Sequence, residues 1–307
     1  MNKSRVLVQM SGGVDSTVAA TMLVEEGFEV IGVTFATYEP RQITCGFSEN
    51  DAKEVCNKLG IQHIYLDIKE LFKKKIIDYF LSEYMQGRTP NPCTKCNPEI
   101  KFGRILELAD ELDAYWLATG HYANVRYDED LQKHIIYRSA NKHKDQTYVL
   151  WGLKEEQISR IKFPIGNYDK KEIRQIAKSH GFINHNKTDS QDVCFIPYNN
   201  YKDYLYQAND NIIDNLKEGN IVFHGKIMGK HKGYPFYTIG QRHGLGISYA
   251  EPLFVKRIIP ETNTIEVGTE DEIYSKALLA HSVNLIKYDN LDEPQLFEVK
   301  IRYNGKS

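Results

Sequence analysis

The run Ser11-Gly12-Gly13-Val14-Asp15-Ser16 constrains this chain most, because it stands between an apolar, β-rich segment (6–10) and a helical one (17–26). Paired glycines let the backbone turn sharply and bring several N–H groups close to a ligand. The helix that follows points its positive N-terminus at the same place. Strand, glycine turn and helix together predict a phosphate-binding loop. The alternative is an ordinary Gly-Gly turn capped by Asp15 or Ser16.

This loop has no Gly-Lys-Ser/Thr ending, so it lacks the lysine with which a Walker loop follows the β- and γ-phosphates. Backbone donors and the hydroxyls of Ser11 and Ser16 must hold the phosphate, and Asp15 could recruit a magnesium ion. The run resembles the pyrophosphate loop of ATP pyrophosphatases. Those enzymes activate a carbonyl or carboxyl oxygen with AMP and release pyrophosphate.

Strand-like and helix-like segments alternate after the loop. The alternation predicts an α/β fold, a doubly wound parallel sheet with its ligands at the carboxyl ends of the strands. Phe35 and Tyr38 follow the second strand and could pack on adenine, although Phe35 is equally compatible with a core position. The expected strands are 6–10, 29–35, 61–66 and 115–118, and the expected helices are 17–26, 50–59, 69–85 and 98–112.

The fourth strand delivers Gly120 and His121 to the edge of the sheet that carries the phosphate loop. His121 could act on a nucleotide or a substrate, but a lone histidine is more often structural. A hairpin over 124–140, a helical run over 148–153 and a capped helix from Asp169 to Gly181 are expected further on.

The β/α alternation stops near residue 206, where short β-like runs with glycine turns begin. We expect a catalytic domain over 1–205, a small central β-domain over 206–249 and a third β-unit over 250–307 that ends in mid-domain.

The composition is that of a soluble globular protein, with 41% hydrophobic and 26% charged residues and a net charge of −2. No apolar run approaches the roughly 18 residues that span a bilayer, and the chain runs from Met1 directly into its first strand without a signal peptide. These features predict a cytoplasmic protein with no membrane partner.

Positive charge gathers locally between residues 220 and 260. Basic groups among aromatic rings suit RNA, whereas the alternative is a solvated face of a small β-domain. The basic residues are Lys226, Lys230, Lys232, Arg242, Lys256 and Arg257, and the aromatic ones are Tyr234, Phe236, Tyr237 and Tyr249.

The chain has five cysteines, Cys45, Cys56, Cys93, Cys96 and Cys194. An odd number without a secretory signal argues against a disulfide framework and leaves metal binding or thiol chemistry. Cys96 stands just ahead of the helix expected from Pro98, with Asn97 as its N-cap and Lys95 beside it, where the thiolate form is favoured.

Six motifs occur in a fixed order: SGGVDS, GRTPNPCTKCNPEIKFG, ATGHY, KDQTY, TDSQDVCFI and GQRHGLGI. Together they resemble the bacterial and organellar tRNA 2-thiouridylase family, over the whole chain. The resemblance implies a nucleotide-binding α/β domain, a small central β-domain and a C-terminal β-barrel, which is shortened here. It also implies an ATP-dependent sulfurtransferase. ATP adenylates the carbon-2 oxygen of the wobble uridine, releasing pyrophosphate, and sulfur then displaces AMP.

The resemblance implies a role for each motif. Cys194 carries a persulfide received from a cysteine desulfurase or relay protein. Cys96 attacks it, liberating sulfide or leaving a Cys96–Cys194 disulfide. Asp15 completes the catalytic set, and no resident metal ligands are assigned; the cofactors are ATP and Mg²⁺. The ATP-binding residues are Gln9, Met10, Ser11, Gly12, Gly13, Val14, Asp15, Ser16, Phe35 and Gly120. The target base meets Asn91, Pro92 and Cys93, and the tRNA meets His121, Lys144, Asp145, Gln146, Arg302 and Tyr303.

Cys93 departs from the family pattern, which commonly has an aspartate there as a candidate for acid/base help. A redox role with Cys96, or a role in shaping the base pocket, fits a thiol better than acid/base catalysis does.

Two other functions remain open. One is an ATP pyrophosphatase that acts on a small carboxylate and needs neither Cys96 nor Cys194. The other is a zinc-bearing RNA-binding protein, in which Cys93 and Cys96 form half of a site completed by Cys45, Cys56 or nearby histidines.

Overall fold

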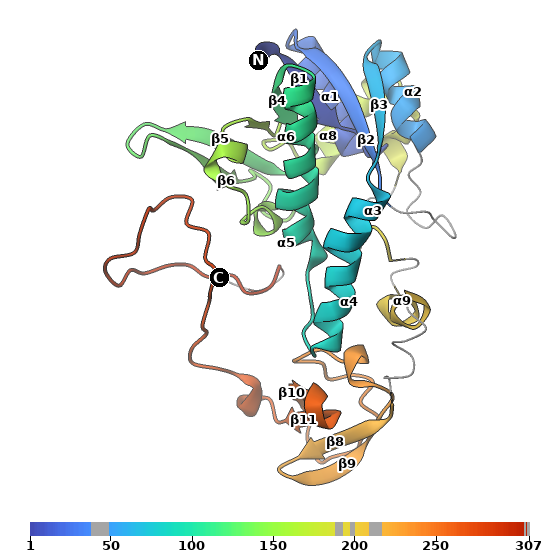
Figure 1. Cartoon of the computed structure of the whole chain (residues 1–307), viewed down its shortest axis with the longest axis vertical. Helices are drawn as coiled ribbons and strands as arrows, with labels where there is room; N and C mark the ends of the chain where they lie inside the picture. The colour runs from blue at the N-terminus through green and yellow to red at the C-terminus, as the bar shows by residue number, and fades with distance from the viewer. Residues whose placement is uncertain (38–48, 188–192, 197–199, 209–216, 304, 306–307) are drawn as a thin grey trace. The chain divides into compact units, whose positions relative to one another are not determined.

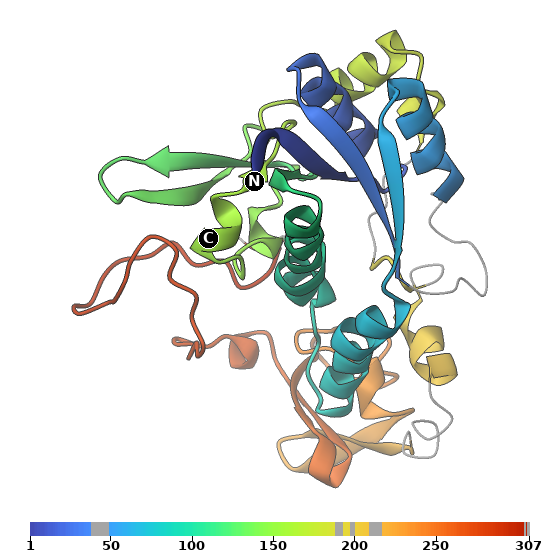
Figure 2. The same cartoon turned by 45° about the horizontal axis from the view of Figure 1, so that its top comes forward.

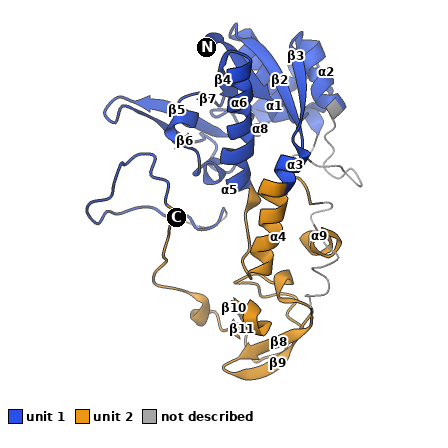
Figure 3. Cartoon of the chain, in the orientation of Figure 1, with its two compact units in different colours: residues 1–73, 93–191, 283–307 blue, residues 74–92, 192–282 orange. Residues whose placement is uncertain are grey.

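The computed structural model describes residues 1–37, 49–187, 193–196, 200–208, 217–303 and 305 (Figure 1). The chain divides into two compact units, coloured separately in Figure 3. Unit 1 contains Met1–Lys73, Cys93–Gln191 and Val283–Ser307, and unit 2 contains Lys74–Pro92 and Asp192–Ser282. Each unit therefore contains segments that are distant in the sequence.

Unit 1 is built on a five-stranded parallel sheet, so the predicted doubly wound α/β fold is confirmed. The order of strands reverses between the neighbours β1 and β4, which places a topological switch point at the end of β1. In sheet order the strands are β3 (Gln62–Asp67), β2 (Glu29–Ala36), β1 (Asn2–Gln9), β4 (Ala114–Ala118) and β7 (Ile161–Lys162).

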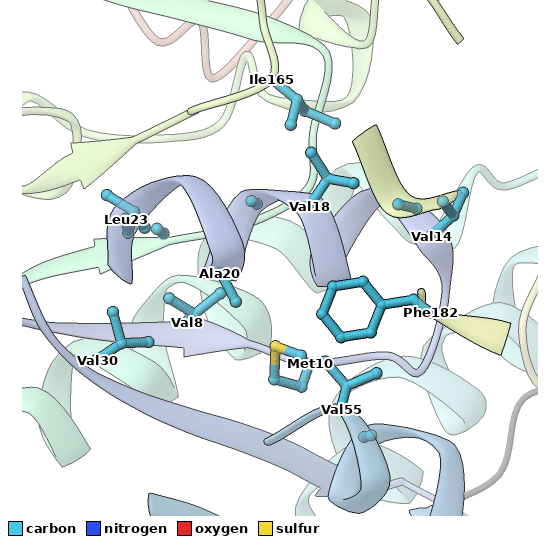
Figure 4. Packing of buried hydrophobic residues seen from close by; sticks show 14 of the residues in the cluster. Val8, Met10, Val14, Val18, Ala20, Leu23, Val30, Val55, Ile165 and Phe182 are labelled. Atoms are coloured by element: carbon cyan, nitrogen blue, oxygen red, sulfur yellow. The ribbon is translucent and has the colours of Figure 1, made fainter. Parts of the chain in front are cut away.

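Helices cover both faces of this sheet (Figures 1 and 2). Strand β1 shows why, because Val6 and Val8 are fully buried in one core cluster and Leu7 in the other. A strand buried on both faces reads as a continuous apolar run, as β1 does. Figure 4 shows the first cluster, in which Ala20 of α1 faces Val8 of β1 while Val18 points toward Ile165 on the other side of the helix.

The helical segments of unit 1 include the π-helical turn η2. They are α1 (Val14–Glu25), α2 (Glu49–Leu59), α3 (Lys69–Phe72), α5 (Pro92–Cys96), η2 (Asn97–Lys101), α6 (Gly103–Glu111), η3 (Thr147–Val149), α7 (Glu155–Ile158), α8 (Lys170–Ser179) and η4 (Ile183–Asn186). A second π-helical turn, η1 (Lys73–Ile77), continues α3 into unit 2. The predicted hairpin is confirmed as β5 (Ala123–Asp128) paired antiparallel with β6 (Lys133–Arg138). The helical run expected over 148–153 is wrong, because only the 3₁₀ turn η3 forms there.

Unit 2 contains a four-stranded sheet in the order β10-β11-β8-β9, which confirms a small β-domain after the α/β region. Its strands are β8 (Gly219–Phe223), β9 (Lys226–His231), β10 (Phe254–Ile259) and β11 (Thr264–Gly268). Its helical segments are α4 (Asp78–Met85), α9 (Tyr201–Ala208), η6 (Tyr234–Phe236), η7 (Pro260–Thr262) and η8 (Asp271–Ile273). The sheet joins strands from both sides of residue 250, and the predicted domain boundaries stay predictions.

Aromatic rings hold the separate segments of unit 2 together. Phe80 on α4 meets Phe195 edge-on at a centroid distance of 5.3 Å, and Tyr84 stacks on Tyr201 of α9 at 5.3 Å. Such pairs contribute about 0.5–1.5 kcal/mol each beyond the area that they bury. The contacts explain why α4 belongs to unit 2 although it continues the helix that begins in unit 1.

Candidate active site

The predicted phosphate loop lies at the carboxyl end of β1 and enters α1 at Val14. Gly12 has a φ of +77°, a left-handed conformation that other residues adopt only with strain. Within the loop, Ser16 Oγ donates to the Gly13 carbonyl at 3.1 Å and accepts from the Ser11 N–H at 3.2 Å. Ser16 is buried and Ser11 is exposed, so the Ser16 hydroxyl braces the loop from inside.

Asn184, which the sequence did not single out, anchors the loop from the adjoining turn η4. Its Nδ2 donates to the Gly12 carbonyl at 3.0 Å and to Thr17 Oγ1 at 2.8 Å. The side chain is almost fully buried, with 1% of its surface exposed. With Gly12 held from behind, the first-turn N–H groups of α1, which lack intrahelical partners, remain available to an anion.

Gly120 lies directly against the loop, as the strand order predicted. A Cβ atom added there would lie 2.7 Å from the Ser16 nitrogen and 2.8 Å from the Asp15 carbonyl carbon. No side chain fits at such distances from backbone atoms. The glycine of the Ala-Thr-Gly-His-Tyr motif therefore allows the end of β4 to contact the phosphate loop.

The carboxylate of Asp15 is held by two residues outside the loop. Tyr122 Oη donates to Asp15 Oδ1 at 2.8 Å, and Lys170 Nζ lies 2.8 Å from both Oδ1 and Oδ2. Neither partner was predicted as a site residue. Tyr122 is the last residue of the Ala-Thr-Gly-His-Tyr motif, so the sequence offered a signal for it. Lys170, at the start of α8, reaches the loop only through the fold.

Three other predicted ATP-binding residues contact the hydrophobic core. Met10 and Val14 are buried in the first core cluster, so their side chains are not exposed to a nucleotide. Phe35, near the carboxyl end of β2, is half-buried against the second cluster, which leaves both of its predicted roles open. Tyr38 and Cys45 lie outside the described residues.

His121 is buried between aromatic rings. Its imidazole lies 5.8 Å from the ring of Phe102 and 6.2 Å from that of Phe163, and Nδ1 is 2.7 Å from Thr119 Oγ1. Burial lowers the pKa of His121 to about 3, so the imidazole is neutral at physiological pH. A tRNA contact by His121, which stays a prediction, would therefore not be a cationic one.

The helix around Cys96 starts earlier than expected. The predicted start at Pro98, capped by Asn97, is wrong, because α5 begins at Pro92 and runs through Cys96 into η2. A proline is well accommodated in a first helical turn, and here Pro92 takes that position. Asn97 instead donates its Nδ2 to the Val149 carbonyl at 2.9 Å.

Cys96 consequently lies inside a helical segment and is buried, with 7% of its surface exposed. Burial raises the pKa of its thiol to about 11, against a smaller opposing effect of Lys101. The expectation that the thiolate is favoured here is therefore wrong for the chain by itself. Cys93, three residues earlier in α5, is half-buried, and Asn91 is exposed just before the helix.

Cys194 lies in unit 2 and is exposed. The next residue, Phe195, is buried among Phe80 and Tyr204, with ring centroids 5.3 Å and 5.4 Å away. This anchor holds the backbone next to Cys194, which is itself an exposed residue. Because Cys96 belongs to unit 1, the redox pairing of the two cysteines stays a prediction.

The predicted tRNA-contact segments meet within unit 1. Gln146 and Tyr122 exchange two hydrogen bonds of 2.9 Å, through the Gln146 side-chain oxygen and N–H. Tyr148 stands beside Tyr303 with ring centroids 6.1 Å apart, and its hydroxyl donates to the Ile301 carbonyl at 3.2 Å. Gln146 is thereby linked through Tyr122 to Asp15 of the phosphate loop, and Tyr303 lies next to Tyr148.

The basic region of unit 2 only partly matches the expected RNA surface. Tyr234, Phe236 and Tyr237 are buried and thus unavailable for stacking on bases, while Tyr249 is exposed. Lys256 forms ion pairs with Glu266 and Glu272, and Arg257 with Glu266. Lys230 also lies within ion-pair distance of Glu218, at 4.0 Å. Lys226, Lys230, Lys232 and Arg242 are all exposed.

Two further observations concern metal and membrane. Within the described ranges, no group of three or more histidine, cysteine or acidic side chains could hold a metal ion. No helix in those ranges combines the length and apolar character needed to cross a membrane.

Comparison with known proteins extends the resemblance seen in the motifs. A family model described as tRNA methyl transferase HUP domain matches residues 4–198, and one described as tRNA methyl transferase PRC-barrel domain matches residues 202–269. Curated relatives named tRNA-specific 2-thiouridylase MnmA align along almost the whole chain. The protein from Halothermothrix orenii is 46% identical over 98% of this chain and 86% of its own. Those from Clostridioides difficile and Carboxydothermus hydrogenoformans are 44% and 41% identical over 100% of this chain and 86% of theirs.

Proposed function

Because this chain belongs to the tRNA-specific 2-thiouridylase family, we propose that it replaces the carbon-2 oxygen of the wobble uridine in tRNA by sulfur. The observation that carries the proposal is identity of 41–46% to such enzymes along nearly the full chain. The phosphate loop and both motif cysteines supply the chemistry that this reaction needs.

The first step is activation of the base by ATP. The uracil carbonyl oxygen is a poor leaving group and must first be activated. It attacks the α-phosphorus of ATP, which attaches AMP to the oxygen and releases pyrophosphate. Backbone N–H groups of the loop and the first turn of α1 hold the pyrophosphate, as preorganised donors do for developing negative charge. Gly120 and Asn184 keep those donors in place.

The donor set at the loop also fits a magnesium ion that accompanies ATP. Magnesium takes hard oxygen ligands, commonly one or two carboxylates together with substrate phosphates. Asp15 supplies one such carboxylate at the loop, held there by Tyr122. The bound ion would neutralise part of the pyrophosphate charge.

The second step is delivery of sulfur. A desulfurase or relay protein transfers sulfur to Cys194, whose exposed position suits contact with another protein. The Cys96 thiolate attacks the Cys194 sulfur of the persulfide, forms a Cys96–Cys194 disulfide and releases hydrosulfide. Hydrosulfide then attacks carbon 2 of the adenylated uridine, and AMP leaves. An external thiol must supply two electrons to reduce the disulfide before the next turnover.

Mass spectrometry of nucleosides tests this function. Unmodified tRNA is incubated with the protein, ATP, magnesium and a persulfide-loaded cysteine desulfurase, and the digest is searched for 2-thiouridine. The same reaction is analysed for nucleotides, because adenylation releases AMP and pyrophosphate. Formation of ADP and phosphate, or absence of 2-thiouridine although AMP is released, would contradict the proposal. The latter result would favour an ATP pyrophosphatase that acts on a carboxylate.

A further inference from the structure

A lysine from outside the phosphate loop holds the loop's single carboxylate. Lys170 and Asp15 are 155 positions apart in the sequence, yet Lys170 Nζ lies 2.8 Å from both carboxylate oxygens. The pair is partly shielded from water, with 15% of the Lys170 side chain and 30% of the Asp15 side chain exposed. A cation is thus fixed at the loop that the proposed function assigns to pyrophosphate.

Helix α8 does not need this ion pair in order to fold or to dock. Its start is capped by Asp169, whose side chain accepts from the Glu172 N–H at 2.8 Å while Glu172 Oε2 accepts from the Asp169 N–H at 2.7 Å. Ile173 and Ala177 are fully buried in the core cluster that contains α1. Packing and capping therefore hold α8 in addition to the contact between Lys170 and Asp15.

The loop by itself has an unfavourable charge for its ligand. Its backbone donors are neutral and its one ionisable side chain, Asp15, repels phosphate. A Walker loop solves this problem with its own lysine, which is missing from Ser11–Ser16. An ammonium group that already contacts the loop carboxylate lies within a short movement of phosphate bound to the same loop.

We propose that Lys170 is a pyrophosphate-binding residue of the ATP site, a proposal that rests on the proposed use of ATP. As ATP binds, the Lys170 ammonium exchanges the Asp15 carboxylate for β- and γ-phosphate oxygens. Tyr122, which is 3% exposed and packed in the core, keeps its 2.8 Å hydrogen bond to Asp15 Oδ1. Asp15 Oδ2, no longer in contact with the ammonium group, would then be able to hold a magnesium ion that enters with ATP.

Equilibrium binding of three probes tests this assignment without tRNA or a sulfur donor. ATP, inorganic pyrophosphate and AMP are titrated in the presence of magnesium into the wild-type protein and the Lys170→Ala variant. Charge-assisted hydrogen bonds predict that Lys170→Ala weakens ATP and pyrophosphate binding about 10- to 100-fold. AMP binding should change less than about threefold, because AMP has no β- or γ-phosphate. The matched control is Lys171→Ala, which removes an exposed lysine one position further along α8.

Further measurements separate a binding role from a structural one. If Lys170→Ala does not fold, Lys170→Met keeps the aliphatic stem and is titrated instead. If Lys170 only neutralises Asp15, the double variant Asp15→Asn/Lys170→Met should recover pyrophosphate binding; we expect that it does not. In the wild-type protein, pyrophosphate should protect Lys170, but not Lys171, from an amine-acylating reagent followed by peptide mass spectrometry.

The outcomes that overturn the assignment are unchanged pyrophosphate affinity in Lys170→Ala or Lys170→Met, an equal loss of AMP affinity, or the same loss in Lys171→Ala. None of these outcomes would contradict the proposed thiolation of tRNA. Conversely, failure of the thiolation assay would not alter the ranking of the three probes.

Discussion

The buried thiol of Cys96 leads to a quantitative prediction about its reactivity. Its pKa is raised from the ordinary value of 9.0 to about 11, mainly by burial. At pH 8 the thiolate fraction of such a group is about 0.1%, against about 10% for an unshifted thiol, a factor of about 100. A thiolate of higher pKa is intrinsically more nucleophilic, which returns a factor of about 6 to 10. Cys96 should therefore react at least about tenfold more slowly than a model thiol, and burial adds to this.

Alkylation by iodoacetamide, followed by peptide mass spectrometry from pH 7 to pH 9.5, measures the effect. The rate at Cys96 should rise about tenfold per pH unit over the whole range, because the pKa lies above it. Cys56 is a matched internal control, since burial also raises the pKa of its thiol to about 11 and it is fully buried in the core. A plateau of the Cys96 rate below pH 9, or a rate at pH 8 equal to that of a model thiol, would refute the burial argument.

Alkylation with and without substrates tests whether substrate binding activates Cys96 for its proposed attack. If substrate binding opens the segment around α5, then tRNA together with ATP should accelerate alkylation of Cys96 and leave Cys56 unchanged. Equal acceleration of both thiols would indicate general loosening of unit 1 instead.

Substitutions at Gly120 and at three of the cysteines are also informative. Gly120→Ala should lower the free energy of unfolding by about 1–3 kcal/mol, as overpacking does, because its Cβ would lie 2.7 Å from the Ser16 nitrogen. The same substitution should weaken ATP binding. Denaturant titration and ATP titration measure the two effects, and unchanged values for both would show that the loop shifts to make room for the methyl group. Cys96→Ser and Cys194→Ser should each abolish 2-thiouridine formation while tRNA affinity stays within about twofold, whereas weakened tRNA binding would make these thiols recognition residues instead. Cys93→Ser should retain single-turnover thiolation; a much faster Cys93→Asp would show that carboxylate chemistry belongs at this position.

The sequence predicted the parallel sheet and the loop well, because both depend on local patterns. Val6, Leu7 and Val8 form an apolar run of the kind that a strand covered on both faces requires. The serine–glycine run after it carries its own turn chemistry. Gly120 could also be placed near the loop, since the carboxyl ends of parallel strands share one edge of the sheet.

The rest of the site depends on contacts between distant segments. Lys170 and Asn184 reach the loop only because α8 and η4 pack beside α1, and helical periodicity does not say which helices become neighbours. The helix begins at Pro92 and not at Pro98, because both prolines suit a first helical turn and the sequence pattern does not distinguish between them. The burial of Tyr234 could not be predicted from the sequence either, because aromatic residues among basic ones can form an RNA-stacking surface or a hydrophobic core.

The division of unit 2 into two separate stretches has a consequence during synthesis on the ribosome. Phe80 and Tyr84 of α4 are translated about 115 residues before the aromatic partners Phe195 and Tyr201 that cover them. At a translation rate of about 5–20 residues per second, the apolar face of α4 lacks its native contacts for about 6 to 23 s. Residues 93–191, which belong to unit 1, emerge during that interval. The apolar face of α4 is therefore exposed to chaperones on the nascent chain while unit 1 is still being synthesised.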